Sequence, residues 1–323
     1  MLKVSLTAPG HFLRDGKPDE LYLTQLSQLG VDCIDITSGS VWPGVREQGY
    51  PDLDEVLRIK RRIAAYGLQL NRVTLPDLTE AFMLNRPGCE KELENACNAV
   101  KVFGEARIPV VRQRFAGDSF TGIMEPYDAL HRGGSVARGE RLRKNPAVPT
   151  HEELSFYWER FCEAYRELVP LAEAYDLQLA MHPSDTPNPE TPFNSLGFHR
   201  IIDAFPSKSV GFIYCVGTRA QAGGSSLVLD EIRQFGRKGR IFSVHFRNVR
   251  GSLPTVGGFE ESMLDDGDMN MFRILMELRK TGYDGCINPD HVPRLTGDDA
   301  GQMMAWAYAV GYIKALINAA DGL

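Results

Sequence analysis

The sequence alternates between short apolar runs and longer amphipathic stretches along its whole length. Eight runs are rich in β-branched residues, which is typical of buried strands, and the stretches between them have helical spacing. Strict alternation predicts parallel strands joined by helical crossovers, in the α/β class. The predicted strands cover residues 3–8, 31–37, 68–76, 108–116, 176–184, 210–217, 241–249 and 284–292. The predicted helices lie near residues 19–29, 52–66, 89–104, 152–175, 196–204, 228–237, 269–281 and 300–318.

Two architectures have this alternation, the closed (β/α)8 TIM barrel and the doubly wound open sheet. The count of eight strands favours the barrel. The segment after the first strand, LTAPGHFLRDG, also lacks the GxGxxG turn of a dinucleotide-binding sheet. Because no repeat, low-complexity tract or linker divides the sequence, we expect one domain over residues 1–323.

Charge and apolar patterning narrow the class of protein. The net charge is −6 and the basic residues are mostly scattered, which weighs against nucleic-acid binding. The first ten residues do not resemble a secretory signal, and Lys314 interrupts the apolar stretch 303–320, so we expect a helix packed on the sheet and no membrane span. The six cysteines form no CxxC pair, and we expect reduced thiols in a cytoplasmic protein.

Two connections are too long to be simple turns. Residues 117–150 follow the fourth strand and residues 250–267 follow the seventh. Both therefore lie on the C-terminal face, where barrel enzymes keep their sites, and each could be a lid or a wall. The first contains a basic run that could equally be a solvated loop: Arg132, Arg138, Arg141, Arg143 and Lys144.

The last four predicted strands each end in a residue that can bind a metal. These residues are His182, Cys215, His245 and Asp290. Each alone has a plainer explanation, such as a structural histidine, a core cysteine or a capping aspartate. Adjacent strand ends of a barrel lie about 5 Å apart, so four of them can converge on one ion.

The ligand types indicate the class of metal. Two imidazoles, a carboxylate and a thiolate suit a divalent transition ion better than magnesium or calcium. Manganese or ferrous iron would leave positions open for substrate, whereas the soft thiolate favours iron, cobalt or zinc over manganese. The residues alone therefore leave the choice of ion open.

Several polar side chains near these ligands are candidates for binding or catalysis. In an extended strand Arg247 lies on the same side as His245, and a guanidinium there suits a substrate carboxylate, although a structural ion pair is the alternative. Asn248 and Arg294 are further candidates for binding substrate, and Arg294 for catalysis together with Arg247.

Two residues beside the last strands have competing interpretations. His291 follows Asp290 directly and could serve as general acid or base, or could hold a metal ligand in place. Asp268 precedes the predicted helix 269–281, and we expect it to cap that helix.

The motifs SVHFRNV, GGFEESMLDDGDMNM, INPDHVPRLTGDD and AYAVGYIKALI, in this order, resemble those of the mannonate dehydratase family. MHPSDTP and FIYCVGT are similar to the earlier metal-bearing segments of that family, and the resemblance covers about residues 176–318. It implies a xylose-isomerase-like barrel that removes water from D-mannonate in hexuronate breakdown. The product would be 2-dehydro-3-deoxy-D-gluconate, and the cofactor Mn2+ or Fe2+.

The resemblance also assigns residues. The metal ligands of the family fall on His182, Cys215, His245 and Asp290, and its substrate-handling arginine and histidine correspond to Arg247 and His291. The alternatives are a dehydratase of a related sugar acid, a sugar isomerase or epimerase, or a metal-free binding barrel. Isomerase sites usually carry several acidic ligands, whereas these strand ends carry one. We also expect a small-molecule partner and a homo-oligomer.

Overall fold

The computed structural model describes residues 2–116, 122–184 and 195–322. Eight parallel strands close into a barrel, because the first strand pairs with both the second and the last. The TIM-barrel prediction is therefore confirmed. The strands, in order around the barrel, are β1 (Lys3–Thr7), β4 (Cys33–Ile36), β5 (Gln69–Thr74), β6 (Val110–Arg112), β9 (Gln178–Met181), β10 (Val210–Cys215), β11 (Ile241–His245) and β14 (Cys286–Asn288).

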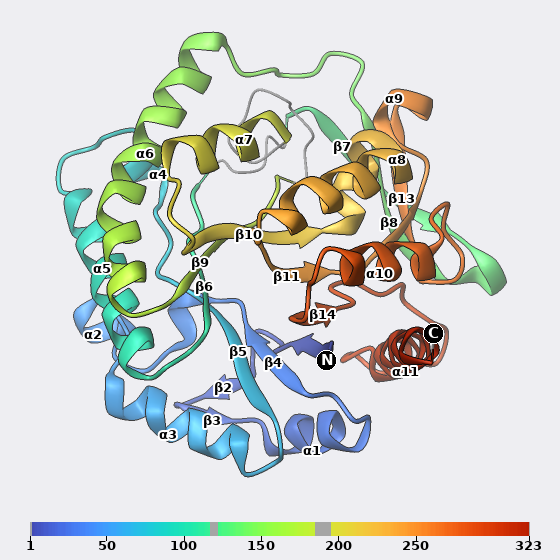
Figure 1. Ribbon diagram of the computed structural model, residues 1–323, viewed down its shortest axis with the longest axis horizontal. Helices are drawn as coiled ribbons and strands as arrows, with labels where there is room; N and C mark the ends of the chain where they lie inside the picture. Colours follow the sequence, from blue (N-terminus) through green and yellow to red (C-terminus); the bar gives the residue numbers. More distant parts are fainter. Residues whose placement is uncertain (1, 117–121, 185–194, 323) are drawn as a thin grey trace.

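Helices surround the barrel (Figure 1), one after each strand. Each buries an apolar stripe on the strands. In α3, for example, Val56, Ile59 and Ile63 are fully buried while the Asp52 side chain caps the first turn. The long helices are α1 (Glu20–Gln28), α3 (Leu53–Ala64), α5 (Glu90–Glu105), α6 (His151–Ala174), α7 (Ser195–Ala204), α8 (Val216–Arg237), α10 (Met271–Lys280) and α11 (Met303–Asp321).

The predicted strands and helices are all present, but several bounds differ, and two of these differences have a clear physical reason. The predicted strand 241–249 divides into β11 and the short β12 (Asn248–Arg250), which belongs to another sheet. Helix α8 begins directly after Cys215, although the sequence predicts it only from residue 228. The glycine pair Gly223–Gly224 has non-helical backbone angles, with φ 70° at Gly224, and divides α8 into two helical segments joined by a kink. The sequence pattern predicts only the second segment.

The two long connections build a second sheet. It has the order β12, β13 (Gly258–Ser262), β8 (Val136–Leu142) and β7 (Met124–Leu130), all antiparallel. Figure 1 shows the hairpin of β7 and β8 beside β13. The basic run is consequently not a free loop: Arg132 pairs with Asp265 at 2.8 Å and Arg141 with Glu125 at 3.2 Å.

The remaining elements are short. They are β2 (Leu13–Arg14), β3 (Lys17–Pro18), α2 (Val45–Gln48), α4 (Glu80–Met83), α9 (Leu253–Val256) and the 3-10 turns Gly39–Val41 and Arg132–Gly134. The apolar C-terminal stretch forms α11, and no helix in the described part of the chain could span a membrane. All six cysteines are free thiols, as the sequence predicts.

Candidate metal centre and substrate cavity

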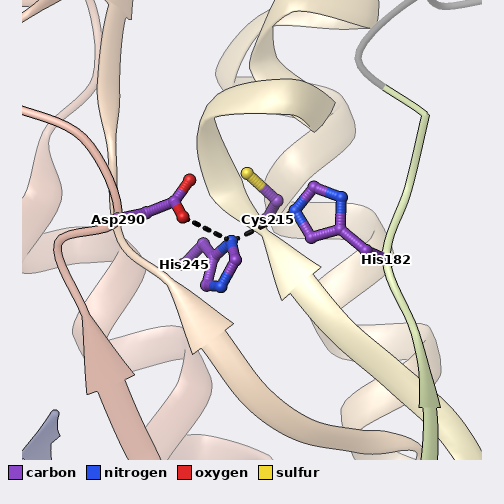
Figure 2. A group of neighbouring side chains, drawn as sticks. All are labelled: His182, Cys215, His245 and Asp290. Carbon is purple, nitrogen blue, oxygen red and sulfur yellow. Dashed lines mark hydrogen bonds and ion pairs between the residues drawn. The ribbon is translucent and has the colours of Figure 1, made fainter. Parts of the chain in front are cut away.

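The four predicted ligands lie at the C-terminal ends of four adjacent barrel strands. Their donor atoms, two imidazole nitrogens, a thiol sulfur and a carboxylate oxygen, all lie within 4.8 Å of one another. Nδ1 of His245 is 3.1 Å from Nε2 of His182 and 3.1 Å from Oδ1 of Asp290. Figure 2 shows the four side chains converging on one point. The order β9, β10, β11 and β14 around the barrel explains why they meet.

This donor set fits a divalent transition ion. A tetrahedral site with ligand bonds of about 2.0–2.3 Å separates its donors by about 3.5 Å, which is within the observed range. Burial lowers the pKa of His182 well below its usual value, and Arg112 and His245 lower it further. Burial also lowers the pKa of His245. Both imidazoles are therefore neutral at pH 7, the form that binds metals.

Cys215 has an environment that favours an anionic sulfur. It is the last residue of β10 and caps the N-terminus of α8, where the helix dipole stabilises negative charge. Its Sγ accepts hydrogen bonds from Oγ1 of Thr218 at 3.2 Å and Nη2 of Arg247 at 3.0 Å. These contacts point to a thiolate that is ready to bind metal.

A tight turn after β14 directs Asp290 to the centre. Asp290 has φ 63°, in the left-handed region that few non-glycine residues adopt. The buried Asn288 side chain holds this turn, because its Oδ1 accepts from the Asp290 N–H at 2.8 Å. Burial alone would raise the pKa of Asp290, but His245 and His291 outweigh it and hold the pKa well below its usual value.

Arg247 is buried against the metal-ligand cluster. Its Nη2 donates to Cys215 and to Oγ1 of Thr218 at 2.8 Å, and its Nε lies 3.0 Å from Oδ2 of Asp290. Its Nη1 forms an ion pair with Glu261. Protein groups thus lie against all three nitrogens of the guanidinium, although among the described residues Nε has the ion-pair contact with Asp290 and no hydrogen bond, and 2% of the side chain is exposed.

Glu261 is a site residue that the sequence did not reveal. It reaches the cluster from β13 of the second sheet, and its Oε1 lies 2.9 Å from Nδ1 of His291. Burial alone would raise the pKa of Glu261, but Arg247 and His291 lower it to about 2. In return, Asp290 and Glu261 raise the pKa of His291 against the effect of burial. The imidazole is 41% exposed and lines the cavity above the cluster.

A cavity of about 360 Å³ opens over the cluster. His182, His245, Asp290, Arg247 and His291 line it. The same cavity is lined by three arginines from the neighbouring strands, which the sequence did not single out: Arg72 from β5, Arg112 from the end of β6, and Arg114 two residues further on. A larger cavity of about 680 Å³ lies at the other end of the barrel, where Lys3, Gln69 and Gln178 begin their strands, and contains none of the metal-ligand cluster.

Three predicted residues lie elsewhere. Asn248 is buried, and its Nδ2 donates hydrogen bonds to the backbone carbonyls of Leu264 and Met269. It therefore holds the loop between β13 and α10 in place. Arg294 lies outside the cavity with 62% of its side chain exposed and pairs with Asp128, because the chain turns outward to pair with β8.

Asp268 was predicted to cap α10, and this was wrong. The cap is Asn270, whose Oδ1 accepts from the Arg273 N–H at 2.9 Å. Asp268 accepts from the Gly251 N–H instead and ties together the two ends of the connection after β11.

The fold and the cluster define a (β/α)8 barrel with a group of side chains that could hold a metal at its C-terminal mouth. A profile of the family described as "D-mannonate dehydratase (UxuA)" matches residues 133–322. The chain therefore belongs to the D-mannonate dehydratase family.

Individual proteins agree with this assignment. The chain is 26% identical over 309 residues to mannonate dehydratase of Geobacillus thermodenitrificans, covering 82% of this chain and 79% of that protein. It is 24% identical over 331 residues to mannonate dehydratase of Thermotoga neapolitana, covering 88% and 89%.

Solved structures share the fold. The crystal structure of mannonate dehydratase from Streptococcus suis serotype 2 has a TM-score of 0.78 at 21% identity and covers 99% of this chain and 95% of that one. A xylose isomerase domain protein from Alicyclobacillus acidocaldarius has a TM-score of 0.61 at 16% identity, covering 98% and 99%. These likenesses show a shared barrel fold.

Proposed function

We propose that this protein is a hydro-lyase that converts D-mannonate into 2-dehydro-3-deoxy-D-gluconate and water. The observation that supports this most strongly is the four-residue cluster. It lies in a cavity lined by arginines, and all four of its members fall inside the stretch matched by the family profile. The reaction removes the proton on C2 and expels the hydroxyl on C3, and the resulting enol becomes the 2-keto acid.

We propose His182, Cys215, His245 and Asp290 as ligands of Mn2+ or Fe2+. A bound divalent ion would supply positive charge that offsets the negative charge developing beside the substrate carboxylate. Because the imidazole of His182 is neutral and the carboxylate of Asp290 is ionised at pH 7, these two ligands would bind the metal without first losing a proton.

His291 is the proposed proton-transfer residue. Nδ1 is bonded to Glu261, whereas Nε2 has only a longer contact of 3.8 Å with Oδ2 of Asp290. Nε2 is therefore the ring nitrogen that would serve the substrate, either taking the C2 proton or protonating the leaving hydroxyl. Arg247 is the proposed positioning residue. Its contacts hold two proposed metal ligands, Cys215 and Asp290, and also Glu261, the hydrogen-bond partner of His291.

The test is an assay for 2-keto-acid formation from D-mannonate by protein loaded with Mn2+ or Fe2+. His291→Ala should lower kcat by at least about 100-fold while one equivalent of metal stays bound. Interconversion of keto sugars without keto-acid formation would instead support an isomerase or epimerase. A transition-metal content below a tenth of an equivalent would support a metal-free binding barrel.

A further inference from the structure

Arg247 is already engaged by protein groups, so the carboxylate of the substrate needs a different cationic partner. Each nitrogen of its guanidinium already faces Glu261, Asp290, Cys215 or Thr218. A substrate carboxylate could bind it only by displacing a buried protein group, which leaves that group unsatisfied. The role of carboxylate binder therefore falls to another cation.

The cavity is also lined by the three arginines Arg72, Arg112 and Arg114, here called the arginine wall. They come from neighbouring strands, since β5 pairs with β6 and Arg72 lies beside Val110 in that register. Arg112 ends β6 and Arg114 lies two residues beyond it, and both line the cavity. Three guanidiniums on one side make a surface that suits an anion.

Arg72 gives the wall a buried, incompletely paired charge. Its side chain is 0% exposed, and Nη2 lies 3.4 Å from Oδ2 of Asp35. That carboxylate also accepts shorter bonds from Ser5, Asn71 and Asn288. No described residue accepts a hydrogen bond from Nε or Nη1 of Arg72, so its positive charge is weakly offset at the floor of the cavity.

Arg114 is the accessible member. Its side chain is 45% exposed, and its acidic partner within the described part of the chain, Asp77, is 3.8 Å away, at the limit of an ion pair. Arg112 is intermediate in exposure, lines the same cavity as His182, and pairs across β6 and β9 with Ala180, two residues before His182. The wall therefore reaches from solvent to the edge of the metal-ligand cluster.

We propose that the arginine wall binds the carboxylate of the substrate and makes the cavity selective for sugar acids over neutral sugars. The inference rests on the proposed function and adds to it the residues that recognise the acid. A neutral substrate would leave the three guanidiniums without an anion.

The experiment measures binding without turnover. The probe is the 3-deoxy analogue of D-mannonate, which lacks the hydroxyl that leaves, and its neutral counterpart is the corresponding amide. Calorimetric titration of the metal-loaded protein gives Kd for each. Arg114→Gln should raise Kd for the acid about fivefold to tenfold and leave Kd for the amide within twofold. Arg112→Gln should have a larger effect and Arg112→Lys a smaller one.

Arg141→Gln is the matched control, because Arg141 is an exposed arginine on β8 outside the cavity and pairs with Glu125. Unchanged acid binding in Arg114→Gln and Arg112→Gln, or equal weakening for acid and amide, would overturn the proposal. An unchanged melting temperature in Arg114→Gln shows that the fold is intact. Arginine-dependent binding without dehydration of D-mannonate would overturn the proposed function and leave the arginine wall standing.

Discussion

Replacing Glu261 by glutamine removes a buried negative charge that lies between Arg247 and His291. The carboxylate is 9% exposed, and its pKa falls from the usual 4.5 to about 2. A lowering of this size corresponds to about 3 kcal/mol in favour of the ionised form. The glutamine variant should therefore lose about 3 kcal/mol of unfolding free energy at pH 7.

The sign of the pH dependence follows from the same shift. Because the folded-state pKa is lowered, the stabilisation is fully present above about pH 4.5 and is lost as the pH falls toward 2. The difference in unfolding free energy between wild type and Glu261→Gln should shrink from about 3 kcal/mol at pH 7 to about 2 kcal/mol near pH 3.5. Urea unfolding at several pH values measures it.

The variant should also lose activity, since the Nδ1 bond that orients His291 weakens. We expect kcat for keto-acid formation to fall about 10-fold to 100-fold, with KM changed less. Glu260→Gln is the matched control, because the adjacent residue on β13 contacts Tyr127 and His131 instead. A Glu261→Gln variant with wild-type kcat and a pH-independent stability difference would refute the reasoning.

Three further predictions concern a proposed metal ligand, a buried hydrogen-bond donor and removal of the metal. Cys215→Ser should weaken binding of Mn2+ or Fe2+ at least about 10-fold by metal analysis after dialysis, whereas Cys162→Ser on α6 should not; equal metal content in both would contradict the assigned ligand. Asn248→Ala should cost about 2–3 kcal/mol in urea unfolding, because the loop carbonyls of Leu264 and Met269 lose their donor; a loss below about 0.5 kcal/mol would show that water replaces it. Chelator treatment should lower both activity and melting temperature, with recovery on adding Mn2+ or Fe2+ but not Ca2+.

The metal-ligand cluster could be predicted because strand ends of a barrel share one rim. Once eight strands were counted, the four donors necessarily fell on neighbouring strands at the same end. The one-domain organisation and the oligomeric state stay predictions, and so do the roles of the site residues.

The site residues that sequence reasoning missed depend on pairing between distant segments. Glu261 reaches the cluster because β13 pairs with β8, which is more than 100 residues earlier, and no local pattern specifies that pairing. Arg112 and Arg114 did leave a signal, since alternate arginines at a strand end must share a face. Arg294 was selected for its nearness in sequence to Asp290, but the outward turn between them separates the two side chains.

The most direct test of the account is the product formed from D-mannonate by the metal-loaded protein in D2O. Mass spectrometry and proton NMR of promptly quenched samples should show a 2-keto acid that has lost one water and carries one deuterium on C3. This pattern requires C2 deprotonation, departure of the C3 hydroxyl and protonation of the enol. A product with no loss of water, or deuterium at C2 of an otherwise unchanged sugar acid, would contradict the dehydratase assignment.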